Sequence, residues 1–240
     1  MKRYRPLFET HSNELVEWAL LEDAGTPFNS KEGLILYEAV INVSVELGNI
    51  ADLLYDVKNI LIPITSIDTF INILNGQFQN KKILFKYNYR LPEDIFTSLN
   101  TFNKKTSEII VYIGPKIHLL NGSNFQELIN DLLHLIGHEL IHREQFLRMD
   151  YIKNIESYAF NDKKTYLSNK QEIMAYAWQI INSFRLHGAL DSDIQKILKT
   201  NSNIKFQLGG KVLADYHDLF TIDDKELKLL YRYMYLYSEN

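Results

Sequence analysis

The segment that most constrains the fold is 124–149, whose apolar residues recur at the spacing of an α-helix. Ser123 and Gln126 match a capping box at its start, in which two side chains satisfy the first backbone N–H groups of a helix. We therefore expect one long helix whose apolar face packs into a core. The residues of that face are Leu132, Leu133, Leu135, Ile136, Leu140 and Ile141.

The rest of the chain combines helical patterns with a few short strand patterns. Residues 82–89 and 108–113 are rich in β-branched and aromatic residues, which favours strands. We expect a further short strand at 116–120 and a short helix or helical turn at 92–99. Helical patterns cover 31–60, with an interruption expected near Gly48, and 66–75, 169–186 and 223–237, with shorter helices at 12–23 and 191–199.

These patterns predict an α+β fold with a helical N-terminal third, a small mixed sheet and further helices. We see no internal repeat and no linker rich in Gly or Ser, so a single domain over 1–240 is expected. Within it we distinguish a helical N-terminal part (1–80), a core (81–190) and a helical C-terminal part (191–240).

The composition excludes several kinds of chemistry. The 240 residues include no cysteine, which rules out disulfides, thiol catalysis and every metal site built on cysteine. Any metal must therefore be held by His, Asp or Glu. The 26 basic and 30 acidic residues give a net charge of -4, which does not favour nucleic acid as a partner.

No segment resembles a signal peptide or a membrane helix. The start of the chain is basic but no apolar stretch follows it. The most apolar stretch, 50–64, contains Asp52, Asp56, Lys58 and Pro63, whereas a membrane helix needs about 18 apolar residues with few charges. We expect a cytoplasmic location and no membrane partner, and the oligomeric state is not indicated.

His138 and His142 are four positions apart in the predicted long helix. Residues at this spacing lie one turn apart on the same face, with about 6 Å between their Cβ atoms. Both imidazoles can then reach one zinc ion at about 2.0–2.1 Å. Glu139 projects beside that ion, where a general base takes a proton from metal-bound water. The alternative is that both histidines only hydrogen bond to backbone carbonyls.

Glu172 is the best candidate for a third ligand, which a catalytic zinc site requires. It lies thirty positions after His142, near the start of the helix predicted over 169–186. Two antiparallel helices would bring its carboxylate over the histidine pair. The alternative is that Glu172 only favours the positive N-terminal end of its own helix.

The combination of His138-Glu139-x-x-His142 with Glu172-Ile-Met-Ala175 resembles the gluzincin type of zincin metallopeptidase, over about residues 108–187. The resemblance implies a zincin-like fold, in which the active-site helix carries the two histidines and a following helix carries the third zinc ligand. The cysteine-free, Asn- and Ile-rich chain also suggests a phage-encoded peptidase. In zincins an edge strand binds the extended substrate, and here 108–113 or 116–120 would be that strand, with 150–168 lining the cleft.

Further site residues are less constrained by spacing. Gluzincins often carry an Asp four positions after the Glu ligand, and here that position is Tyr176, whose hydroxyl could accept from an imidazole N–H. An oxyanion stabiliser is also expected. We take Tyr176 and His187 as candidate catalytic residues beside Glu139. Other candidates are Tyr158 and Tyr166 for the oxyanion and Gln145 for substrate contact. His134 is a candidate for an outer hydrogen-bond partner of the histidine pair or for an alternative ligand.

The predicted function is zinc-dependent hydrolysis of peptide bonds in a protein or peptide substrate. One alternative is a zincin-like binding or structural module without catalysis. Another is a metal hydrolase that acts on a bond other than a peptide bond. The sequence does not indicate which substrate is cleaved, because specificity depends on pocket walls that a motif does not define.

Overall fold

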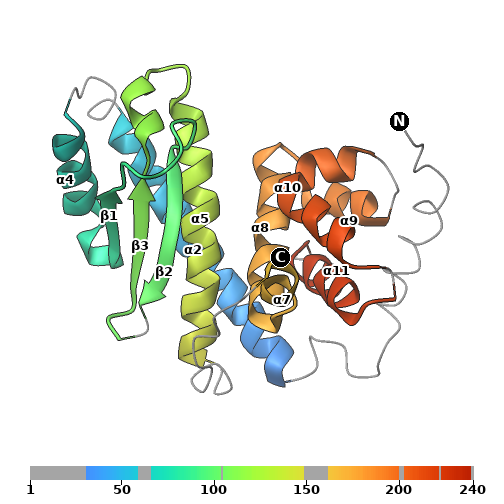
Figure 1. Ribbon diagram of the computed structural model, residues 1–240. Coiled ribbons are helices and arrows are strands. Elements are labelled where there is room, and N and C mark those ends of the chain that lie inside the picture. The colour runs from blue at the N-terminus through green and yellow to red at the C-terminus, as the bar shows by residue number, and fades with distance from the viewer. Residues whose placement is uncertain are drawn as a thin grey trace. The chain divides into compact units, whose positions relative to one another are not determined.

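The structure is a computed structural model (Figure 1), and it describes residues 31–58, 66–103, 105–148, 162–199, 203–221 and 223–238. The chain divides into two compact units. Asn42–Leu147 forms the sheet unit, and Met1–Ile41 with Arg148–Asn240 forms the helical unit. The helix predicted over 12–23 lies outside the described residues.

Three strands of the sheet unit form a mixed sheet in the order β1-β3-β2 (Figure 1). β1 (Ile83–Tyr87) runs parallel to β3 (Glu108–Ile113), whereas β2 (Thr97–Asn103) runs antiparallel to β3. Alternate residues of β1 and β3 are buried, so that Phe85 and its partner Val111 lie on the core face. The strands predicted over 82–89 and 108–113 are thus confirmed, and the fold is α+β.

Two local predictions in this unit are wrong. The second half of the helical turn predicted over 92–99 belongs to β2, because pairing with β3 supplies backbone hydrogen bonds that local propensity does not reflect. The strand predicted over 116–120 is a 3-10 helix, η2 (Pro115–Leu119), which begins with a proline that fixes a helical φ. The strand order places β3 in the centre of the sheet. Neither 108–113 nor 116–120, the two segments expected to provide the edge strand, therefore lies at the sheet edge.

The outer edge of β1 is closed by one side chain of α4 (Ile67–Phe78), which is followed by η1 (Gln79–Lys81). The side-chain amide of Asn75 donates to the carbonyl oxygen of Phe85 at 3.0 Å, and its Oδ1 accepts from the N–H of Phe85 at 2.7 Å. These bonds occupy the two groups that β1 would offer to another strand at this residue. The Phe78 ring also packs edge-on against Phe85, with 5.3 Å between centroids.

Two long helices, α2 (Lys31–Asp56) and α5 (Phe125–Arg148), confirm the helices predicted over 31–60 and 124–149. The interruption expected near Gly48 is wrong, because α2 continues through that residue. Their buried residues recur every three or four positions, which is the stripe that an amphipathic helix turns toward a core. In the sheet unit the stripe of α2 consists of Val43, Leu47, Ile50 and Leu54. That of α5 consists of Phe125, Leu128, Ile129, Leu132, Leu133, Ile136, Leu140 and Ile141.

Polar contacts connect these two helices within the sheet unit. The guanidinium group of Arg143 is paired with the carboxylate of Glu46. Farther along, the Tyr55 hydroxyl donates to Oε1 of Gln126 at 2.9 Å. Because Glu46 precedes Tyr55 whereas Arg143 follows Gln126, the two helices run antiparallel. Arg143 directly follows His142, so this ion pair fixes α5 next to the histidine pair.

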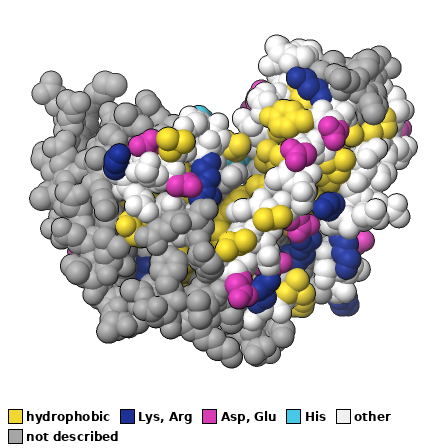
Figure 2. Space-filling model, turned by 180° about the vertical axis from the view of Figure 1, so that it is seen from behind, with side chains coloured by type: hydrophobic (Ala, Val, Ile, Leu, Met, Phe, Trp, Pro, Cys, Tyr) yellow, Lys and Arg dark blue, Asp and Glu magenta, His cyan; other side chains and the backbone are white. Residues whose placement is uncertain are grey.

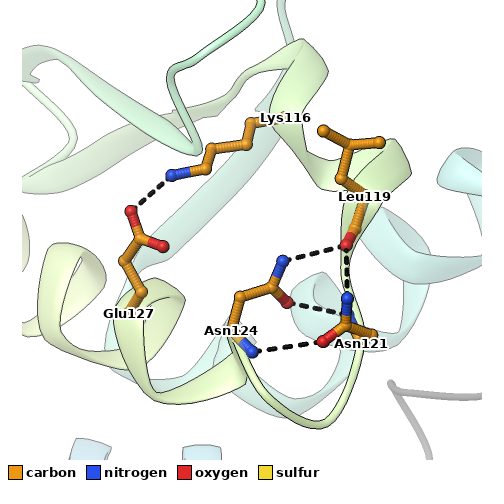
Figure 3. Close-up of polar contacts among 5 residues, drawn as sticks. All are labelled: Lys116, Leu119, Asn121, Asn124 and Glu127. Carbon is orange, nitrogen blue, oxygen red and sulfur yellow. Dashed lines mark hydrogen bonds and ion pairs between the residues drawn. The ribbon is translucent and has the colours of Figure 1, made fainter.

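Two asparagines, rather than the predicted capping box, close the N-terminus of α5 (Figure 3). Oδ1 of Asn124 accepts from the N–H of Asn121 at 2.7 Å, and Oδ1 of Asn121 accepts from the N–H of Asn124 at 3.3 Å. Both side-chain amides donate to the carbonyl oxygen of Leu119, at 3.2 and 2.9 Å. Since an asparagine amide both accepts and donates, the pair ties the start of α5 to the end of η2.

The helical unit is built from α7 (Lys163–Leu167), α8 (Lys170–Leu186), α9 (Asp191–Lys199), α10 (Asn203–Leu219) and α11 (Lys225–Ser238). The helices predicted over 169–186, 191–199 and 223–237 are confirmed. α8 packs against α10 and α11, and α9 packs against α11. The buried side chains of this core include Trp178, Ile181, Phe184, Ile194, Leu213, Leu230 and Met234.

Two sequence features of the helical unit find a structural explanation. The Gly209-Gly210 pair marks a kink in α10, where Gly210 has φ 66 and ψ -166, a conformation that favours glycine. The tyrosine-rich segment of α11 belongs to the core, since Tyr231, Tyr233 and Tyr237 are buried.

Acidic and basic side chains lie interspersed over the described part of the face in Figure 2. Among the described helices, none combines the length and the apolar composition that crossing a bilayer requires. The expectation that the chain binds no nucleic acid remains a prediction.

Replacing Asn75 by alanine should lower the free energy of unfolding by about 1–3 kcal/mol, because the N–H and C=O of Phe85 lose their partner. Chemical denaturation followed by circular dichroism measures the change. Asn72→Ala, at an exposed position of the same helix, is the matched control and should change stability by less than about 0.5 kcal/mol. Equal stability of Asn75→Ala and the wild type would show that Asn75 does not protect the edge of β1.

Candidate metal centre

The imidazoles of His138 and His142 converge on α5. Their Nε2 atoms lie 3.1 Å apart, and the ring centroids are 4.7 Å apart at an interplanar angle of 79°. Two nitrogen ligands at about 2.0–2.1 Å from a tetrahedral zinc ion are separated by about 3.3 Å. The spacing of the two Nε2 atoms therefore fits a shared ion after a shift of only a few tenths of an ångström.

Gln145 orients the second of these imidazoles. Its Oε1 lies 2.9 Å from Nδ1 of His142, and the Gln145 side chain is buried. An amide oxygen can only accept, so Nδ1 of His142 carries the proton and Nε2 presents its lone pair. The sequence suggested substrate contact for Gln145, whereas the structure shows a residue that holds a histidine. Its position three residues after His142 was the signal for this contact, because residues at that spacing are neighbours on a helix.

Glu139 lies beside the histidine pair on the same helix. At 100° per residue it is displaced by about 100° from His138 and by about 60° from His142 around the helix axis. Glu139 and His138 are both buried, with 6% and 3% of their surface exposed. A carboxylate at this position is turned too far around the helix to be a third ligand of the same ion. It can instead exchange a proton with a group bound in front of the two histidines.

Asp131 lies on the same side of α5, two turns before His138. The pKa of its carboxyl group is raised to about 6, mainly by burial and also by the nearby charge of Glu127, whereas the charge of Lys116 partly offsets this rise. The ammonium group of Lys116 pairs with Glu127, which lies one turn before Asp131 on α5 (Figure 3). The helix that carries the histidines thus has a partly buried acidic group in its second turn.

Glu172 is placed by the first turn of α8 in the helical unit. Asn169 caps that helix, with its side chain accepting from the backbone N–H of Gln171. Oε2 of Glu172 accepts a hydrogen bond from the Tyr166 hydroxyl at 2.7 Å. Burial and the charge of Glu172 raise the pKa of Tyr166 above its usual value, which keeps this phenol protonated as a donor.

The remaining catalytic candidates lie at different places in the helical unit. Tyr176 is four positions after Glu172, on the same side of α8, and its hydroxyl donates to the hydroxyl of Tyr166 at 3.2 Å. His187 is exposed at the other end of α8, with Nδ1 2.7 Å from the carbonyl oxygen of Ser183. Fifteen helical positions correspond to about 22 Å, so His187 does not belong to a site that contains Glu172. Tyr158 lies outside the described residues.

His138, His142 and Glu172 each offer one ligand atom of a kind that binds zinc. Two imidazoles and one carboxylate are a donor set that zinc commonly accepts, and three protein ligands leave a position for water or substrate. The histidines belong to the sheet unit and Glu172 to the helical unit. Coordination of one ion by all three is therefore a prediction that metal analysis of variants must test.

Comparisons of this chain with protein-family models, with curated protein sequences and with solved structures found no match. The resemblance to gluzincins therefore depends on the residues and spacings of the site itself.

Asp131 should make the stability of the sheet unit depend on pH. Its pKa in the folded state is above the unfolded value, so the folded state binds the proton more tightly. The free energy of unfolding should therefore rise as the pH falls from about 7 toward about 4. Asp131→Asn should be more stable than the wild type near neutral pH and lose this advantage in acid. Denaturation at several pH values measures the difference, and a constant difference would contradict the prediction.

Replacing Gln145 by methionine, which has a similar volume but no acceptor for Nδ1–H, should weaken zinc binding by about 10–100-fold. Competition with a chromophoric chelator measures the affinity. Gln145→Glu keeps an acceptor at this position and serves as the matched control. An unchanged affinity in Gln145→Met would show that the bond to His142 has no part in holding a metal.

Proposed function

We propose that this chain is a zinc-dependent metallopeptidase whose zinc ion is held by His138, His142 and Glu172. The proposal depends above all on one observation, the 3.1 Å separation of the two imidazole Nε2 atoms on a buried helix. Glu172, which lies near the start of the next long helix in the sequence, is the candidate for the third, acidic ligand. The lack of cysteine is consistent with this ligand set.

Zinc bound by three protein ligands lowers the pKa of a coordinated water to about 7 and polarises a carbonyl oxygen. Glu139 then serves as the general base, because its carboxylate lies beside the histidine pair. It accepts the proton of the attacking water and later donates it to the leaving amine. The buried position of Glu139 keeps bulk water away from this proton transfer.

The sheet offers a place for an extended substrate, although not the one expected from the sequence. β3 is central, and the edge of β1 is occupied at Phe85 by Asn75. β2 is the other outer strand of this sheet, so we assign to it the backbone pairing with a peptide that zincins use. The assignment agrees with a protein or peptide as the substrate.

Glu139→Gln should retain zinc but lower peptide hydrolysis by about 10²–10⁴-fold, because the amide cannot accept the proton. His142→Ala should lose both zinc and hydrolysis, since it removes a ligand. Elemental analysis of the purified proteins gives the zinc content. Mass spectrometry of a mixture of unstructured peptides gives the cleavage rate.

Equal cleavage by Glu139→Gln and the wild type would rule out this mechanism. Zinc that raises the melting temperature of the wild type without cleavage of any peptide would favour a binding or structural module instead. A wild-type protein without zinc affinity would exclude the zinc site and, with it, the proposed peptidase.

A further inference from the structure

The carboxylate of Glu172 is the end of a chain of two phenols. The hydroxyl of Tyr176 donates to the hydroxyl of Tyr166 at 3.2 Å, and that of Tyr166 donates to Oε2 of Glu172 at 2.7 Å. A phenol carries a single proton, so the direction of the chain is fixed once its last acceptor is a carboxylate. Each donor in such a chain polarises the next, which strengthens the bond to Glu172.

The rings of this chain are fixed by their own packing. Tyr166 and Tyr176 meet edge-on with 6.1 Å between centroids, and Tyr176 meets Tyr216 edge-on at 6.3 Å. The hydroxyl of Tyr216 donates to the carbonyl oxygen of Leu167 at 3.1 Å, which ties α10 to the end of α7. The backbone next to Tyr166 is thus held by a third helix. Rotation of the Tyr166 phenol away from Glu172 would break its edge-on contact with Tyr176.

The helix ends on both sides of this chain are also capped. Asp162 begins α7, and its carboxylate accepts from the N–H and the hydroxyl of Thr165 at 2.8 and 2.7 Å. Asn169 caps α8, and its own N–H donates to the carbonyl oxygen of Tyr166 at 3.1 Å. Tyr166 and Glu172, which form the 2.7 Å bond, therefore each lie on a helix with a capped N-terminus.

We propose that Tyr166 is a positioning residue for Glu172, and that Tyr176 acts on the same carboxylate through Tyr166. This inference rests on the proposed role of Glu172 as a zinc ligand. A bond to Oε2 restricts the rotation of the carboxylate. Tyr176, which the sequence suggested as a catalytic residue, is then part of the support of a ligand. Outer partners of metal ligands commonly contribute about 10–100-fold to metal affinity.

The test is a double-mutant cycle on zinc affinity, measured with Zn²⁺ and a competing chromophoric chelator. Tyr166→Phe should bind zinc about 10–100-fold more weakly than the wild type. Tyr176→Phe should show a smaller loss of a few fold. The double variant should bind as Tyr166→Phe does, because Tyr176 has no route to Glu172 once the Tyr166 hydroxyl is gone.

Tyr231→Phe is the matched control, since it removes a buried phenol of the same unit that is paired with His217 at 2.9 Å. It should leave zinc affinity unchanged. The visible spectrum of the Co²⁺-substituted proteins gives a second readout, and it should change in Tyr166→Phe but not in Tyr231→Phe. Circular dichroism shows whether each variant is folded. If Tyr166→Phe does not fold, the loss of zinc affinity in Tyr176→Phe still tests the inference.

The outcomes separate this inference from the proposed function. A wild-type protein that does not bind zinc overturns the proposed function and the inference together. Zinc binding by the wild type with equal affinity in Tyr166→Phe overturns the inference alone. Additive losses in the double variant would show that Tyr176 acts on the site independently of Tyr166, which also contradicts it.

Discussion

The one-turn spacing of His138 and His142 is the constraint on which the rest of the proposed site depends. A helix fixes the relative position of residues four apart, so the two imidazoles can converge only if this part of α5 stays helical and immobile. The buried stripe on the opposite side of α5 supplies that rigidity. The ion pair between Arg143 and Glu46 also holds α5 in place, one residue after the second histidine.

The polar groups near the candidate ligands follow a common arrangement. Nδ1 of His142 is bonded to Gln145, and Oε2 of Glu172 is bonded to Tyr166. In each case the bond restricts the rotation of the side chain that would bind the metal. A side chain held in this way has less conformational freedom to lose when it binds a metal, which is why such bonds raise metal affinity. Neither bond depends on how the two units of the chain are placed.

When one outer strand of a sheet is protected, a peptide can add only to the other outer strand. A mixed sheet of three strands has two outer edges, and each presents unpaired backbone groups. In this chain Asn75 fills the edge of β1 at Phe85 with a side-chain amide that reproduces the donor and acceptor of a neighbouring strand. The strand order places β2 at the other edge, which is the one that we propose for strand addition.

The sequence determined the helices that bury an apolar stripe, because a period near 3.6 is visible in the residues themselves. It also determined the pairing of His138 with His142 and the place of Glu139, since these follow from helix geometry alone. Only the tertiary structure decided that residues 97–103 form a strand and that 116–120 does not, because strand pairing and a proline-started turn override weak local preferences. The contact of Tyr166 with Glu172 joins two helices across a turn, and no periodicity signals which side chains meet there.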